Sequence, residues 1–265
     1  MNKYFLSLLI LFTLFNDLLL AGVNQRTIAV IFTQKKDLTE FSNIFDGTKV
    51  KTIQVASTTI HELVSKDKTM LIRTALAGKG AVQSALTTER LLSQSGRKVS
   101  LLITGGVVGS LDRSVARLDW IRIKQVVAYQ TSDLTRYTQF FEPKFSKPDL
   151  NKQWQMIKQV NCASGEQFVK DNGKGQEIAH SSQCQVVDMN LFGIISSSKS
   201  YNVQSFHFRR VSDYANENAI ADFSDYMKNE DGKIGRLMAK IVTSLSKDKT
   251  DPASYETLNK LLEGH

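Results

Sequence analysis

The side chains best suited to acid–base chemistry in this sequence are Ser212 and Asp213, in the segment VQSFHFRRVSDYA. The first part of the segment has the pattern of a half-buried strand, and Asn216 and Glu217 are typical of a helix start. A carboxylate where a strand gives way to a helix lies where open α/β sheets usually bind ligands. Asp is also a frequent helix cap. Asp213 is therefore predicted to be either a ligand-binding acid or a cap.

Glycines follow two of the expected strands: Gly78 and Gly80 after the first, and Gly105, Gly106 and Gly109 after the second. Glycines at such points let the backbone turn tightly or approach a ligand closely. Neither group has the spacing of a phosphate-binding loop or of the dinucleotide-binding fingerprint. The glycines after the second strand are therefore predicted either to form a tight turn or to let the backbone approach a ligand.

Strands and helices are expected to alternate along the chain, which predicts a single α/β domain with a central sheet covered on both faces. Strands are expected at 27–32, 50–55, 70–76, 99–104, 120–129, 160–163 and 185–189. Helices are expected at 34–45, 81–92, 150–160, 190–200, 216–226 and 232–245, with a short turn at 258–262. Polar segments at 131–149 and 171–182 are expected to be loops.

The start of the chain has the pattern of a secretory signal peptide, with an apolar run over residues 5–15. The run is too short, and Asn16 and Asp17 interrupt it, for a good membrane-spanning helix. We expect residues 1–21 to be removed on export, leaving 22–265 as one domain in the periplasm or outside the cell. An uncleaved membrane anchor is the alternative.

The chain has only two cysteines, Cys162 and Cys184. In an oxidising compartment they could pair, so a disulfide is a hypothesis. No spacing of Cys and His resembles a zinc site, and no metal or cofactor is expected.

The net charge of +8 favours anionic partners such as phosphorylated ligands, acidic polysaccharide or lipid headgroups. The basic residues are scattered in small groups, without the interleaved aromatic side chains of single-strand binders. A nucleic-acid partner is therefore not expected.

Four segments stand out by their order and spacing: TIAVIFTQKKDL, AGKGAVQSA, TGGVVGSLD with DWIRIKQVVAY, and the block SGEQFV, VVDMN and RRVSDYAN. Together they resemble the purine nucleoside phosphorylase and nucleosidase superfamily, and most of all the bacterial 5′-methylthioadenosine/S-adenosylhomocysteine nucleosidases. The resemblance runs from residue 27 to about residue 245. It implies a three-layer α/β/α sandwich with a central mixed sheet, a small-molecule nucleoside substrate and a homodimer.

The resemblance also implies roles for individual residues. Asp213 falls on the aspartate that meets purine N7, and Asp37 falls where a glutamate activates water. Phe168 and Val169 fall where the base is stacked and hydrogen-bonded. Phe168 could equally be a core residue. The remaining implied substrate-binding residues are Gly78, Asp188, Met189, Asn190 and Ser212.

The implied chemistry is cleavage of an N-glycosidic bond. A carboxylic acid whose pKa is raised by a dry pocket can protonate the departing base, and Asp213 is the candidate. A second carboxylate, Asp37, would orient water on the opposite side of the sugar, as in inverting glycosidases.

The chain departs from the resembled pattern in ways that bear on activity. Asn190 stands where a glutamate grips the ribose hydroxyls, and neutral hydrogen bonds are roughly half as strong as charged ones. Asp37 is one methylene shorter than the expected glutamate, Asp188 also replaces a glutamate, and Ala77 replaces a frequent serine.

Three hypotheses follow. The first is an exported purine nucleosidase that hydrolyses adenosine-type nucleosides and depends on Asp213 and Asp37. The second is a phosphorylase with a cationic phosphate pocket, for which Arg73 is the candidate. The third is a protein that binds a nucleoside or a polyanion with little turnover.

Overall fold

The computed structural model describes residues 26–94, 98–131, 134–138, 140 and 154–246. The expected signal peptide, most of the segment 131–149 and the expected turn at 258–262 lie outside the described residues. Within the described part of the chain, no helix is both long and apolar enough to cross a membrane.

The strands form one mixed sheet in the order β10-β6-β8-β9-β5-β1-β4-β3-β2, with β7 paired to β6. Their bounds are β1 Arg26–Phe32, β2 Gly47–Val55, β3 Thr58–Ser65, β4 Met70–Leu76, β5 Val99–Ser110, β6 Trp120–Ala128, β7 Arg136–Tyr137, β8 Lys158–Ser164, β9 Val186–Asp188 and β10 Gln204–Tyr214. β10 also pairs with β5, so that β5, β10, β6, β8 and β9 close into a circuit from which β1, β4, β3 and β2 extend.

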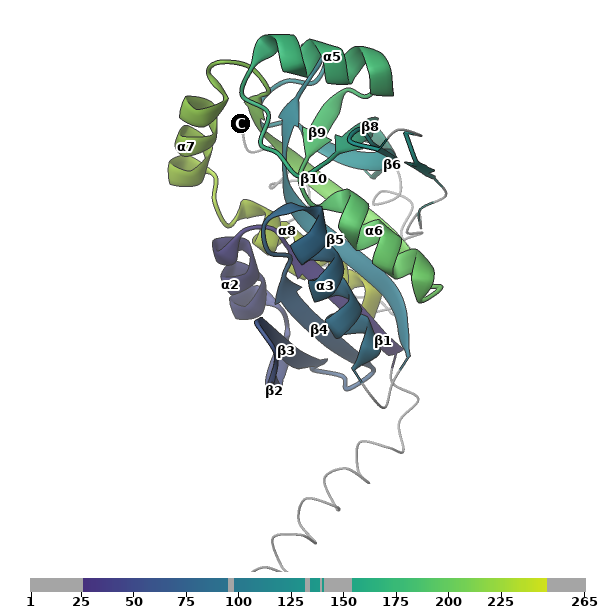
Figure 1. Cartoon of the computed structure of the whole chain (residues 1–265). Helices are drawn as coiled ribbons and strands as arrows, with labels where there is room; N and C mark the ends of the chain where they lie inside the picture. Colours follow the sequence, from purple (N-terminus) through teal and green to yellow (C-terminus); the bar gives the residue numbers. More distant parts are fainter. Residues whose placement is uncertain (1–25, 95–97, 132–133, 139, 141–153, 247–265) are drawn as a thin grey trace, which may run out of the picture.

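Helices cover both faces of the extended part of the sheet (Figure 1). On one face lie α2 Lys35–Ile44 and α8 Lys233–Ser246, and on the other lie α3 Gly80–Ser93 and α6 Leu191–Ser200. The other two helices, α5 Asn172–Ser182 and α7 Ala219–Asn229, contact β8 and β10. Residues of α2 and α8 join one apolar cluster with the sheet, and residues of α3 and α6 join another. This is the three-layer arrangement that the sequence predicted.

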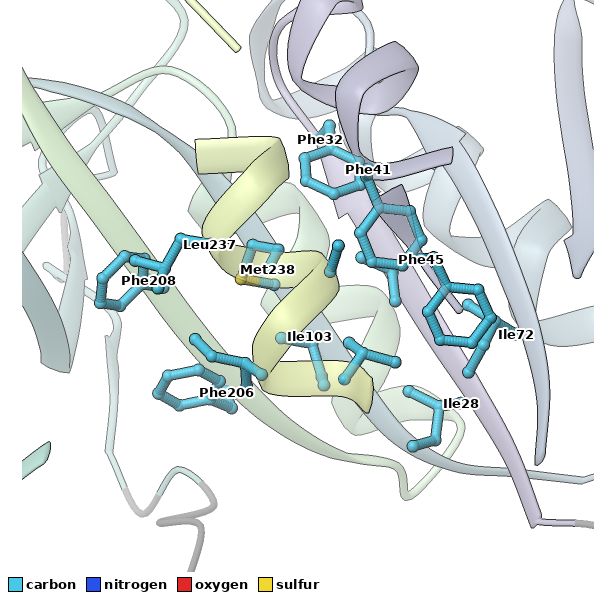
Figure 2. Close-up of a cluster of buried hydrophobic side chains, with 14 of the residues drawn as sticks. Ile28, Phe32, Phe41, Phe45, Ile72, Ile103, Phe206, Phe208, Leu237 and Met238 are labelled. Carbon is cyan, nitrogen blue, oxygen red and sulfur yellow. The ribbon is translucent and has the colours of Figure 1, made fainter. Parts of the chain in front are cut away.

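The alternation along β1 explains the two layers. Ile28, Val30 and Phe32 point into the cluster with α2 and α8, whereas Ala29 and Ile31 point into the cluster with α3 and α6. A strand buried on both faces needs such a continuous apolar run. Figure 2 shows the first cluster, in which aromatic rings of β1, α2 and β10 surround the side chains of α8.

Several expected elements are corrected by the structure. Residues 171–182 are not a loop but contain α5, whose buried positions Gly175, Ile178 and Ser182 follow a helical spacing. The expected helix over 150–160 is wrong from Ile157 on, because Ile157 lies in a bend and β8 begins at Lys158. The strand β3 was not expected at all.

For the glycines after the expected strand at 99–104, the alternative of a tight turn is wrong. Gly105, Gly106 and Gly109 do not form a turn but lie inside β5, which runs to Ser110. In the same way Ser212 and Asp213 lie within β10, where the pairing with β5 shifts register between Val211 and Asp213. A shift of this kind turns a side chain to a different side of the sheet.

The hypothesis of a disulfide is wrong in this structure, because Cys162 and Cys184 are both buried free thiols. The thiol of Cys162 lies against the carbonyl of Ala163, and that of Cys184 against the carbonyl of Ser182. Burial raises the pKa of both thiols, which keeps them in the unreactive neutral form.

Candidate active site

A cavity of about 500 Å³ lies at the end of the sheet where β1, β4, β5 and β10 finish. Most of the predicted site residues line it. They are Gly78, Phe168, Val169, Asp188, Met189, Asn190, Ser212 and Asp213. They come from segments far apart in the sequence, because carboxyl ends of parallel strands meet at one edge of a sheet.

Asp213 is the acid of this cavity. Its side chain is 1% exposed. Ser212 Oγ donates a hydrogen bond of 2.6 Å to Asp213 Oδ2. Asp213 Oδ1 has no partner among the described residues. An unpaired buried carboxylate oxygen is costly, so the neutral acid is favoured. Asp213 lies inside a strand, so it is not the helix cap that the sequence left open.

Burial raises the pKa of Asp213 to about 7. The hydrogen bond from Ser212 lowers this pKa, the charge of Asp222 raises it, and the charge of Arg117 lowers it. Gly109 makes room for the carboxyl, because a Cβ at that position would lie 2.8 Å from Asp213 Oδ1. The outcome is a carboxyl that can hold and release a proton near neutral pH.

Asp188 lines the cavity, but both of its carboxylate oxygens already interact with other groups of the protein. Oδ1 accepts from Ser164 Oγ at 2.7 Å and from the backbone N–H groups of Asn190 and Leu191. Oδ2 lies 3.5 Å from Arg209 Nη2, and both side chains of this ion pair are buried. Asp188 therefore stabilises the start of α6.

The apolar part of the cavity is built around Phe168. Its side chain is 38% exposed, and its ring lies 5.8 Å from that of Phe223 in an edge-to-face arrangement. Phe223 belongs to α7, which Arg117 ties to β10 by bonds to the carbonyl of Ser212 and to Asp222. Two aromatic rings at the mouth of a cavity suit a flat apolar ligand.

The expected position of Asp37 on the cavity wall is wrong in this structure. Asp37 is fully buried and does not line the cavity. Its Oδ1 accepts from the backbone N–H of Gly235 at 3.0 Å, so it joins α2 to α8. Burial raises its pKa to about 7.

The candidate for phosphate binding, Arg73, also lies elsewhere. Its Nε donates to Glu62 at 2.9 Å and its Nη1 to the carbonyl of Gln94 at 3.1 Å. It is 3% exposed and does not line the cavity. The expectation of a phosphate pocket around Arg73 is therefore wrong in this structure.

Some cavity residues were missed in the sequence. They are Thr33, Gln34, Lys79, Gln167, Ile220 and Phe223. Lys79 could have been found from the sequence, because it stands between Gly78 and Gly80. Ile220 and Phe223 follow one another at helical spacing on α7, but a pattern of that kind also describes an ordinary buried helix face.

The described residues contain no group of three or more His, Cys, Asp or Glu side chains arranged to hold a metal ion. The charged side chains that line the cavity are Lys79, Asp188 and Asp213. The protein itself occupies the Asp188 carboxylate. The cavity therefore offers a ligand one proton donor, Asp213, one cation, Lys79, and an apolar surface around Phe168.

The family model described as the phosphorylase superfamily matches residues 27–247. An aminodeoxyfutalosine nucleosidase of Helicobacter pylori is 22% identical over 236 residues, which cover 83% of this chain and all of that protein. A 5′-methylthioadenosine/S-adenosylhomocysteine nucleosidase of Staphylococcus aureus is 24% identical over 234 residues, covering 82% of this chain and all of that protein.

Solved structures agree with the fold. The 5′-methylthioadenosine/S-adenosylhomocysteine nucleosidase of Helicobacter pylori in complex with butyl-thio-DADMe-Immucillin-A has a TM-score of 0.68 at 22% identity, covering 85% of this chain and 100% of that one. The Neisseria meningitidis nucleosidase in complex with methylthio-immucillin-A has a TM-score of 0.68 at 20% identity, covering 83% and 99%. These likenesses confirm the predicted fold class.

Proposed function

The chain belongs to the phosphorylase superfamily, and we propose that it is a nucleosidase that hydrolyses adenosine-type nucleosides to free base and sugar. The observation that carries the proposal is Asp213: a buried carboxyl with a pKa of about 7 and an unpaired oxygen, in the wall of a cavity. The names of the relatives support the same class of substrate.

In the proposed reaction the bond between the sugar C1′ and the purine nitrogen breaks, and its electron pair goes to the base. Asp213 gives its proton to N7, so the base leaves neutral. Water forms the new bond to C1′ and releases a proton, which restores Asp213 through the solvent. A positioned acid of this kind contributes roughly 10²–10⁴-fold in rate.

The other cavity residues support binding. Phe168 and Phe223 offer ring surfaces to a purine, and base–aromatic stacking is worth about 1–3 kcal/mol. Val169 and Met189 add apolar contact on the same wall. Asp37 has no part in the proposed reaction, because it does not line the cavity.

A second candidate is a nucleoside-binding protein with little turnover. It is favoured by the position of Asp37 outside the cavity and by the neutral Asn190 within it. Removal of residues 1–21 on export, a homodimer and an anionic partner surface belong to the proposal as further predictions.

The test is base release from a panel of adenosine-type nucleosides, followed by chromatography, by purified protein with and without phosphate. We expect release that needs no phosphate and that falls by about 10²-fold or more in Asp213→Asn, which keeps the shape but cannot supply the acid. Strict dependence on phosphate would replace hydrolysis by phosphorolysis. Nucleoside binding without base release would favour the second candidate.

A further inference from the structure

The helix α7 carries Ile220 and Phe223 to the cavity wall, but little apolar packing holds it there. Its buried residues are Ala219 and Tyr226, and the element that it chiefly contacts is β10. Ile220 is exposed although it lines the cavity. A segment with few buried apolar contacts opens easily, so the polar contacts of α7 decide how firmly it stays in place.

The side chain of Arg117 bonds to both α7 and β10. Its Nη1 donates to Asp222 Oδ1 at 3.1 Å, and its Nη2 donates to the Asp222 carbonyl at 3.3 Å and to Asp225 Oδ2 at 2.9 Å. Its Nε donates to the carbonyl of Ser212 at 3.3 Å. That carbonyl belongs to the peptide group that precedes Asp213. The guanidinium thus joins α7 to the backbone of the proposed acid.

The backbone that carries Arg117 is itself fixed to β10. The Leu118 N–H donates to the Val211 carbonyl at 2.8 Å, and the Val211 N–H donates to the Asp119 carbonyl at 3.1 Å. The side chain of Arg117 is 26% exposed and that of Asp222 is 18% exposed, so this ion pair is partly shielded from solvent. Because a guanidinium presents its N–H donors in a rigid fork, one that is anchored in this way can hold several acceptors at set positions.

We infer that Arg117 is a positioning residue that holds α7 in place beside the cavity and couples this helix to the peptide group of Asp213. Arg117 does not line the cavity, so it acts through Ile220 and Phe223, which do. Its loss should lower the fraction of molecules in which this part of the cavity wall is complete, and apparent affinity falls in proportion to that fraction. The inference rests on the proposed function only for the class of ligand.

The first experiment follows α7 directly and needs no ligand. Hydrogen–deuterium exchange of the α7 amides is compared between the wild type, Arg117→Met and the control Arg113→Met. Arg113 is exposed in the same loop between β5 and β6 and does not line the cavity, so the control removes the same charge. We expect α7 to exchange about tenfold faster in Arg117→Met and within about twofold of the wild type in the control. Equal exchange in the wild type and Arg117→Met would overturn the inference.

The second experiment measures binding of a carbon-linked adenosine analogue, which cannot be hydrolysed, by calorimetry. We expect Arg117→Met to bind it about tenfold more weakly than the wild type, and Arg113→Met to bind within about twofold. Unchanged affinity in Arg117→Met would overturn the inference, because the position of α7 would then not matter to the ligand. If the wild type does not bind the analogue, the proposed function fails, and the exchange experiment still decides whether Arg117 holds α7.

The pH–rate profile separates this coupling from a general loss of stability. Burial raises the pKa of Asp213 to about 7, and of the charges around it Asp222 raises this pKa and Arg117 lowers it. Arg117→Met should therefore move the fall of kcat/KM to higher pH and Asp222→Asn to lower pH, although both variants should bind the analogue more weakly. Shifts in the same direction would overturn the coupling. If Arg117→Met does not fold, Asp222→Asn breaks the same ion pair and decides by exchange and binding.

Discussion

At the scale of single residues, Asp213 combines the features of a general acid. Its burial raises the pKa, and the hydrogen bond from Ser212 opposes that rise. The two effects leave the carboxyl with a pKa of about 7. Because the acid form is the proton donor, the proposed reaction should be fast below this pKa and should slow as pH rises through it.

We therefore predict that kcat/KM falls about tenfold per pH unit above pH 7, and that Ser212→Ala moves this fall to higher pH. Loss of the Ser212 hydroxyl removes a bond that lowers the pKa of Asp213. The pH–rate profiles of the two proteins are the measurement. An unchanged or lower midpoint in Ser212→Ala would show that another group controls the profile.

At the scale of elements, the contact between α2 and α8 depends on a glycine. A Cβ at Gly235 would lie 1.9 Å from the carbonyl oxygen of Asp37, so only glycine allows the two helices to approach this closely. The same approach lets the Gly235 N–H reach the Asp37 carboxyl. The Asp37 carboxyl therefore joins α2 to α8, and its raised pKa should make the stability of the fold depend on pH.

The raised pKa of Asp37 makes stability depend on pH in a defined direction. Its pKa is about 7 when folded and 3.8 in an ordinary setting. Between these values the unfolded chain has released this proton and the folded chain has kept it. This group therefore lowers the free energy of unfolding as pH rises from about 4 to about 7, and the loss levels off above that range.

We predict that Asp37→Asn, which stays neutral and can still accept from Gly235, is more stable than the wild type at pH 8. A gain of about 1 kcal/mol would raise Tm by about 2–4 °C for a protein of this size. At pH 4 the two proteins should differ much less. Thermal unfolding followed by circular dichroism at both pH values is the measurement, and Asp213→Asn controls for the second buried acid. A lower Tm for Asp37→Asn at pH 8 would contradict the argument.

Sequence patterns identified most elements at this scale but not their ends. The expected strand at 70–76 agrees with β4, and the helix at 81–92 with α3. The segment 171–182 was misjudged because its polar composition hid a narrow buried face in α5. Propensity is a weak signal where only a few positions are buried, and tertiary contacts then decide.

At the scale of the whole molecule, the apolar run near the start of the chain bears on where the protein works. We predict that the exported protein lacks residues 1–21 and begins at Gly22. Mass spectrometry of the protein recovered from outside the cytoplasm measures this, with the protein made without residues 1–21 as the mass standard. A mass that retains Met1 would contradict cleavage and favour an uncleaved anchor.

The sequence by itself determined the layers of this protein and the acid at its cavity. Continuous apolar runs such as 27–32 specify buried strands through local spacing alone. Asp213 stood out because the sequence placed it at the end of an expected strand, although it lies within β10. The four segments contain all of the residues that line the cavity except Ile220 and Phe223, although not all of them were given a role from the sequence. Their common location follows from the order of strands in a parallel sheet.

Only the tertiary structure decided what two of the side chains do. Asp37 is bound by Gly235, 198 positions away, and Asn190 is held by Gly78, 112 positions away. A local pattern gives the type of a side chain and its place on an element, but not the partner that meets it from a distant segment. For this reason Asp37 faces α8 instead of the cavity, and the Asn190 amide donates to the Gly78 carbonyl.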